Sequence, residues 1–197
     1  MLKLTSMASK ARGLNAYVQG KEEYAFLQDK QFAQGDVVCT NILCADGSLI
    51  SLKLDTSLPR AYSREFTVSG TKGLFSVPDH VVLTDEMTFN HDLEMAEYSG
   101  NDKAVYEENM PAVWKNITKE QIEAGHGGMD TLTLQAFFGA ALSGEEMPID
   151  VYDAASWMVI TCLSEASIAN GGMPMDIPDF TGGKWVLRES KDVVSLE

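Results

Sequence analysis

Basic residues, histidines and cysteines are all scarce in this sequence, and each shortage excludes a class of protein. Lysine and arginine together number 15, against 29 aspartates and glutamates, which gives a net charge of −14. Such an acidic chain argues against the nucleic-acid backbone or an anionic membrane as the main partner. The three cysteines are an odd, scattered set that provides no disulfide framework. The three histidines show no metal-ligand spacing, so we expect no metal site.

Long hydrophobic runs and nucleotide-binding motifs are missing as well. No run approaches the roughly 18 apolar residues of a membrane span, and the N-terminus has no apolar core of signal-peptide length. No Gly-x-Gly-x-x-Gly follows a predicted strand, so the sequence carries no dinucleotide fingerprint. What is present is an ordinary globular composition, 45% hydrophobic and 22% charged over 197 residues. This composition predicts a single domain with a core.

The first part of the chain, residues 1–84, is rich in predicted strands. The expected elements are a strand over 1–9, a short helix or turn over 10–18, a polar loop over 19–35, a hairpin of strands 37–44 and 48–56, and strands over 62–69 and 74–77. Gly47 can take the positive φ that the hairpin turn needs. Alternation places Ile50, Leu52 and Leu54 on one covered face. The four strands from 37 onward are expected to form one antiparallel or mixed open sheet.

The second part is predicted to be helical after an acidic excursion over 85–109. Helices are expected over 111–124, from a cap at Asp130 to Leu142, and from a cap at Asp150 to Asn170, followed by an extended tail over 174–185. The inner face of the middle helix is expected to carry Leu134, Phe137, Phe138 and Ala141. The fold class predicted is therefore α+β, an open antiparallel or mixed sheet with helices packed on one face, in a single domain.

The motif with chemical potential is Gly125-His126-Gly127-Gly128-Met129-Asp130, directly before a predicted helix. Glycine permits unusual backbone angles and lets a ligand approach the main chain closely. A helix N-terminus adds unpaired amide donors and a partial positive charge. His126 could then exchange a hydrogen bond or a proton with a sugar hydroxyl. The spacing alone favours a glycine-rich connector with a surface histidine over this functional interpretation. Arg12 and Tyr62 are weaker candidates, as a hydrogen-bonding and a stacking contact to a sugar, since each residue type is more often structural when it stands alone.

Three segments of the chain resemble one family. They are Ser9-Lys-Ala-Arg-Gly-Leu-Asn-Ala-Tyr17, then Leu58-Pro-Arg-Ala-Tyr-Ser63 with Val68-Ser-Gly-Thr-Lys-Gly-Leu74, then the block from Gly125 to Trp185. This last block includes the motifs Asp-Val-Tyr-Asp-Ala-Ala and Pro-Asp-Phe-Thr. The chain resembles the C-terminal domain of the glucose-fructose oxidoreductase and inositol dehydrogenase superfamily. Within it, the chain is most similar to glycoside hydrolase family 109, the NAD-dependent α-N-acetylgalactosaminidases.

The resemblance implies a two-domain bacterial enzyme with the sugar between its domains. An N-terminal Rossmann domain would hold NAD, and the C-terminal domain would bind the substrate and form a dimer through its sheet. The implied reaction is oxidation at C3 of the sugar, elimination of the leaving group, hydration and re-reduction, which needs no pair of carboxylates flanking the bond. His126 would be the catalytic residue, and Arg12, Tyr62, Gly127, Gly128 and Asp130 would bind substrate.

This sequence departs from the family pattern because it carries no Rossmann segment. We therefore expect no NAD bound to this chain alone and no turnover by it. The chain would be an excised domain, a truncated gene product or one half of a split enzyme. In the last case its partner would be a separate Rossmann domain. Two alternatives stay open. One is the C-terminal domain of an NAD(P)-dependent sugar dehydrogenase, and the other is a non-catalytic domain that self-associates or binds carbohydrate. Uncovered apolar helix faces predict a homodimer, and the compartment stays open between cytoplasm and periplasm.

Overall fold

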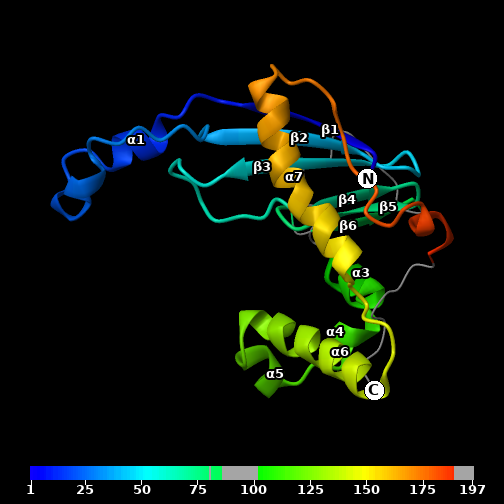
Figure 1. Ribbon diagram of the computed structural model, residues 1–197. Coiled ribbons are helices and arrows are strands. Elements are labelled where there is room, and N and C mark those ends of the chain that lie inside the picture. Colours follow the sequence, from blue (N-terminus) through cyan, green and yellow to red (C-terminus); the bar gives the residue numbers. More distant parts are fainter. Residues whose placement is uncertain (80, 86–101, 189–197) are drawn as a thin grey trace. The chain divides into compact units, whose positions relative to one another are not determined.

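The computed structural model describes residues 1–79, 81–85 and 102–188 of the chain (Figure 1). Its contacts divide the chain into two compact units. The first unit takes Met1–Arg60 and the segment that begins at Ile149, and the second unit takes Ala61–Pro148. Because the first unit is built from two distant stretches of sequence, the second unit is a long insertion into it. Each unit is described below by itself.

The first unit contains a four-stranded antiparallel sheet. Its strands are β1 (Lys3–Ala8), β2 (Val37–Leu43), β3 (Leu49–Asp55) and β7 (Met175–Asp176), in the order β3-β2-β1-β7. The predicted hairpin is confirmed, because β2 pairs with β3 in register from Val37↔Asp55 to Leu43↔Leu49. Gly47 has a φ of +87° in the turn, a backbone angle that glycine adopts without strain.

Helix α7 (Val151–Ala169) lies across this sheet (Figure 1). Its predicted cap at Asp150 is confirmed, since the Asp150 carboxylate accepts the amides of Tyr152 and Asp153. The Asp153 side chain accepts the Asp150 amide in return, which completes a capping box. The helix ends at Asn170, as the sequence predicts. α7 packs against β1 and β7, so it covers one face of the sheet.

The interface between α7 and the sheet is unusually polar at its centre. Leu4 and Ile42 are fully buried there, together with the hydroxyl side chains of Ser6, Thr40 and Ser167. Ser167 Oγ accepts the Ser6 amide at 2.9 Å, and Ser6 Oγ lies 2.7 Å from Thr40 Oγ1. Because these buried groups satisfy one another, the contact can be both polar and closely packed.

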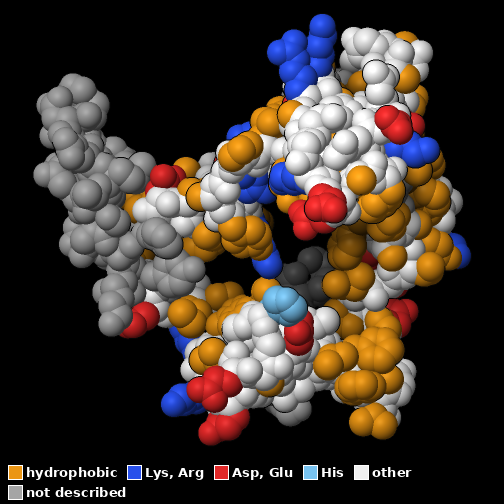
Figure 2. Space-filling view, turned by 90° about the vertical axis from the view of Figure 1, so that its left-hand side faces the viewer, with side chains coloured by type: hydrophobic (Ala, Val, Ile, Leu, Met, Phe, Trp, Pro, Cys, Tyr) orange, Lys and Arg blue, Asp and Glu red, His pale blue; other side chains and the backbone are white. Residues whose placement is uncertain are grey.

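The sheet face that carries α7 is only partly covered, although the sequence predicted that the whole face would be covered. Ile50, Leu52 and Leu54 pair with Ile42, Thr40 and Val38 and therefore lie on the same face as the buried residues. They are nevertheless about half exposed, because β3 forms the edge of the sheet and α7 packs on β1. Hydrophobic side chains are also prominent on the molecular surface drawn in Figure 2.

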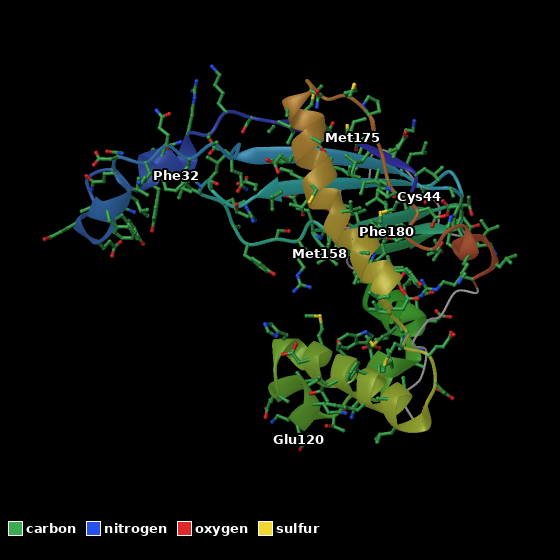
Figure 3. The ribbon with its side chains drawn as sticks, in the orientation of Figure 1. Phe32, Cys44, Glu120, Met158, Met175 and Phe180 are labelled. Carbon is green, nitrogen blue, oxygen red and sulfur yellow. The ribbon has the colours of Figure 1, made fainter. Side chains whose placement is uncertain are left out.

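A small lobe links β1 to β2 and contains two short helical elements. Helix α1 (Gly13–Tyr17) is confirmed, whereas the expected loop over 19–35 contains a 3₁₀ helix, η1 (Glu22–Leu27). The Asn15 side chain ties the lobe together by donating to the Phe32 carbonyl and accepting the Phe32 amide, both at 3.0 Å. Phe32 is labelled in this lobe in Figure 3. The Gln19 and Gln28 side chains add hydrogen bonds to the Gln28 and Lys21 carbonyls, so carboxamides supply much of the hydrogen bonding along this polar stretch.

Arg188, in the segment that follows β7, binds the first turn of α7. After the short 3₁₀ helix η3 (Lys184–Leu187), the Arg188 guanidinium donates to both Asp153 carboxylate oxygens, at 2.9 and 2.8 Å. Two parallel bonds of this kind are the strong form of an arginine–carboxylate pair. The Arg188 hydrogen bonds, followed by the Asp150 amide, hold the pKa of Asp153 below its usual range.

We expect this pair to make the stability of the first unit depend on pH. Since the folded-state pKa of Asp153 is lowered, its contribution is present above about pH 4 and is lost as the pH falls through the folded-state value. Asp153→Asn should cost about 1 kcal/mol at neutral pH and progressively less in acid, as measured by urea unfolding at several pH values. Asp176→Asn is the matched control, because Asp176 makes a single exposed ion pair with Lys3 at 3.3 Å. An equal effect of both substitutions at all pH values would contradict the prediction.

The second unit begins with a separate antiparallel sheet, so the expected single sheet is wrong. Its strands are β4 (Thr67–Gly70), β5 (Gly73–Ser76) and β6 (Val81–Thr84), in that order. The strand expected over 62–69 starts only at Thr67. Glu65 has a φ of +48°, and its amide donates to Ser63 Oγ at 3.0 Å, which makes a turn where a strand was predicted.

Four α-helices and a short 3₁₀ segment complete the described part of the second unit. They are α3 (Asp102–Asn109), α4 (Ala112–Lys115), α5 (Lys119–Glu123), η2 (His126–Gly128) and α6 (Met129–Ser143). The excursion predicted over 85–109 thus ends in a helix, while residues 86–101 lie outside the described part. The single helix expected over 111–124 is broken, because Thr118 is extended and starts a new capping box with Gln121.

Helix α6 buries a different side from the one predicted. Ala140 is buried, and Leu132 and Ala136 are half-buried, whereas Leu134, Phe137 and Phe138 are about half exposed. Gly144 ends the helix in the left-handed conformation, as expected. The fold class is confirmed as α+β with open antiparallel sheets and helices. No helix among the described residues is both long and apolar enough to cross a membrane.

Candidate functional site

The Gly-His-Gly-Gly segment has a backbone that the sequence pattern makes possible. Four consecutive residues have positive φ: Gly125 (143°), His126 (43°), Gly127 (66°) and Gly128 (96°). Three of them are glycines, for which these angles cost little. His126 is one of two non-glycine residues with positive φ in the described part of the chain. Such a residue persists only where the surrounding structure holds it, and it is a frequent sign of a functional position.

Neighbouring elements hold this loop in place. The 3₁₀ helix η2 packs against α5, and the Gly128 amide donates to the Gly125 carbonyl at 2.8 Å. Gly128 is buried, and a Cβ at this position would collide with the side chain of Ile117. The loop therefore closes tightly over Ile117 and delivers the chain directly into α6, with Gly128 as its N-cap.

His126 and Asp130 form the central contact of the site. His126 Nδ1 lies 2.8 Å from Asp130 Oδ2, across one turn of the chain. Asp130 was predicted to cap α6, and this prediction is wrong. The helix begins at Met129, so Asp130 lies in its first turn, where a negative charge is favourable, and its carboxylate turns back to the imidazole. The side chains of His126 and Asp130 are 72% and 55% exposed, so the imidazole is open to solvent.

Arg12 lies in the first unit, at the N-terminus of α1. Its backbone is fixed by Asp36, a carboxylate that is only 7% exposed. This carboxylate accepts the Arg12 amide at 3.1 and 3.0 Å and the Gly13 amide at 2.8 Å. A Cβ on Gly13 would lie 2.6 Å from the Ser57 carbonyl oxygen, so only glycine fits there. The backbone of Arg12 is thus anchored firmly while its side chain is exposed.

Tyr62 belongs to the second unit, where its side chain is strongly exposed. Its hydroxyl accepts a hydrogen bond from Arg64 Nε at 3.2 Å. Within the second unit the structure therefore brings His126, Gly127, Gly128 and Asp130 together, and it shows no hydrogen bond from Tyr62 to them among the described residues. The roles of Arg12 and Tyr62 stay predictions.

Neither a metal centre nor a nucleotide cradle emerges from the described part of the chain. No three His, Cys, Asp or Glu side chains gather there as a metal site. Every strand pairing among the described residues is antiparallel, whereas a dinucleotide sits against parallel strands in a βαβ unit. These residues therefore do not fit NAD, and no redox step is assigned to them.

One relevant residue, Asp36, was missed from the sequence. It is separated from Arg12 by 24 positions in the chain, so no local pattern links the two. The pairing of His126 with Asp130 had a readable signal, since residues four apart lie on the same side of a helical turn. This spacing was not used, because Asp130 was interpreted as the cap of the following helix.

The antiparallel α+β architecture is consistent with the C-terminal domain of the glucose-fructose oxidoreductase and inositol dehydrogenase superfamily. The family model of the glycosyl hydrolase 109 C-terminal domain matches residues 1–187. The chain therefore belongs to glycosyl hydrolase family 109.

Curated relatives agree with this assignment. The chain is 39% identical to a glycosyl hydrolase family 109 protein of Stenotrophomonas maltophilia over 94% of its length, and it covers 40% of that protein. It is 37% identical to an α-N-acetylgalactosaminidase of Tannerella forsythia over 95% of its length, covering 39% of that protein. A similar match, at 34% identity, is an α-N-acetylgalactosaminidase of Shewanella oneidensis. The chain thus spans about two fifths of the length of the relatives that it matches.

Proposed function

We propose that this chain is the substrate-binding domain of an NAD-dependent glycosidase that acts on α-N-acetylgalactosaminides. The observation that carries the proposal is the exposed imidazole of His126, held by Asp130 on a glycine loop in a family 109 domain. Two matched relatives are named α-N-acetylgalactosaminidase, which supports this sugar over others. The whole reaction would be oxidation at C3, elimination, hydration and re-reduction.

The part of the work assigned to this chain is recognition of the sugar. His126 is exposed enough to exchange a hydrogen bond or a proton with a sugar hydroxyl. Gly127 carries no Cβ and has open space around the position where one would be, so a ligand can approach the backbone there. NAD, which the family uses, would be bound by a separate domain, because the described residues form no cradle for it.

Partners of the chain belong to the same proposal. We propose a Rossmann domain as one partner and a second copy of the chain as another. The support is the amount of apolar side chain that the described residues leave exposed, including Phe137, Phe138 and Leu142 on α6. Large exposed apolar areas mark interaction surfaces in folded proteins. The chain alone is expected to release no chromophore from an aryl α-N-acetylgalactosaminide, even with NAD added.

The sugar proposal is tested by titrating the 197-residue chain with N-acetylgalactosamine and following backbone amide shifts by NMR. We expect binding in the millimolar range, with the largest shifts at residues 125–130. His126→Asn should weaken binding about tenfold, the effect of losing one hydrogen bond to the ligand. Asparagine is the suitable replacement because it tolerates the left-handed conformation of His126.

Glu123→Ala provides the control for this titration. Glu123 is an exposed carboxylate on α5 that pairs with Lys119 at 3.8 Å, and α5 is the helix against which the loop packs. Its removal should leave sugar affinity within twofold of the original. Absence of any shift at millimolar sugar, or equal binding by the His126→Asn variant, would reject the proposal.

A further inference from the structure

We propose that Asp130 is a positioning residue, whose carboxylate keeps the ring proton of His126 on Nδ1 and leaves Nε2 as the free acceptor. The inference rests on the proposed function, in which His126 meets the sugar. It changes the role of Asp130, which the sequence suggested as a helix cap and a direct substrate contact. It also states which ring nitrogen of His126 the substrate would meet.

The direction of the hydrogen bond follows from the chemistry of the two groups. A carboxylate can only accept a hydrogen bond, so at 2.8 Å from Asp130 Oδ2 the nitrogen Nδ1 must donate. In a neutral imidazole the other nitrogen is then unprotonated and accepts. No other hydrogen bond or ion pair involves the His126 ring within the described residues. Nε2 is therefore available to a ligand.

The backbone is arranged around this contact. Gly125 has a φ of +143°, and a Cβ built on it would lie 2.8 Å from Asp130 Oδ2. The missing side chain at Gly125 thus leaves the space in which the carboxylate approaches the imidazole. His126 itself is held at a φ of +43°. An ion pair between exposed groups contributes little to stability. The unusual backbone angles of Gly125 and His126 therefore indicate that the His126–Asp130 hydrogen bond has a functional role.

The consequence for chemistry is a defined proton acceptor. When a sugar hydroxyl donates to Nε2, the proton can pass fully to the ring. The O–H bond then breaks, the Nε2–H bond forms, and the oxygen keeps the electron pair. The imidazolium that results lies against the Asp130 carboxylate, which stabilises its positive charge. With the opposite tautomer, Nε2 would carry the proton already and could only donate.

The ring tautomer can be read directly by long-range ¹H–¹⁵N NMR of the 197-residue chain. The spectrum is recorded at a pH well above the ordinary histidine pKa of about 6.5, and His126→Asn identifies the His126 signals. We expect the Nδ1–H form to predominate at His126. In Asp130→Ala the ring should revert to the tautomer mixture of the free side chain, and affinity for N-acetylgalactosamine should fall about threefold to tenfold.

Glu123→Ala, which removes a carboxylate without touching the ring, should change neither the tautomer nor the affinity. A proton on Nε2 in the original chain, or an unchanged tautomer in Asp130→Ala, would overturn the positioning role, and the first of these readings does not depend on Asp130→Ala being folded. The sugar titration is a separate measurement. If the Nδ1–H form is present but no sugar binds, the proposed function fails while the arrangement of the ring stands.

Discussion

Replacing Asp36 by alanine is expected to lower the free energy of unfolding of the first unit by about 3 kcal/mol. The substitution removes a buried carboxylate that accepts the amides of Arg12 and Gly13. Each amide left without a partner costs about 1–3 kcal/mol, and loss of the side chain that caps a helix typically costs about 1 kcal/mol. Urea unfolding followed by circular dichroism gives the stability, and hydrogen exchange at the two amides reports the local effect.

Asp46→Ala is the matched control for this experiment. Asp46 also accepts a backbone amide, that of Ser48 at 3.0 Å, but it does so at an exposed hairpin turn. We expect its removal to cost less than about 1 kcal/mol, as surface substitutions usually do. If Asp36→Ala were no more harmful than Asp46→Ala, the anchoring of the Arg12 backbone by a buried carboxylate would be wrong.

The second large effect is expected for Ser167→Ala, at about 2 kcal/mol. The Ser167 side chain is fully buried, accepts the Ser6 amide at 2.9 Å and donates to the Met173 carbonyl at 2.8 Å. Alanine fills nearly the same space, so the loss comes from the buried amide and carbonyl that remain unpaired. The measurement is thermal and urea unfolding of the chain, supported by faster hydrogen exchange of the Ser6 amide.

Ser143→Ala separates this effect from the general change of serine to alanine in a helix. Ser143 is exposed on α6, and its hydroxyl donates at 2.9 Å to the Gly139 carbonyl of its own helix. Its replacement should be neutral or slightly stabilising, since alanine has the higher helix propensity. Similar stability changes for the two serines would show that the buried network under α7 contributes little.

Local features of the fold were predictable because their causes lie within a few residues. The hairpin around Gly47, the cap at Asp150 and the end of α7 at Asn170 all depend on short-range backbone chemistry. Prediction failed where an equally local but less conspicuous signal was overlooked. The Thr118 capping box that divides a helix and the Ser63–Glu65 turn that shortens a strand are examples.

Other features depend on contacts between distant residues, and no local pattern carries them. Alternation placed Ile50, Leu52 and Leu54 correctly on one face, but how far α7 extends over that face is decided by packing. The division of the strands between two sheets likewise depends on which strands pair with one another. At the site, glycine content predicted the unusual backbone, whereas the direction in which Asp130 turns depends on the angle of Gly125.

The discontinuous first unit also has a consequence for the way the chain is made. β1, β2 and β3 are synthesised before their covering helix α7, which follows β3 roughly a hundred residues later, or about 5–20 s of synthesis. During that interval the backbone amide of Ser6, the hydroxyl of Thr40 and the side chains of Leu4 and Ile42 lack the partners that α7 supplies. A nascent sheet with an uncovered apolar face is prone to aggregation, so the length of the insertion between β3 and α7 sets how long this face stays uncovered during synthesis.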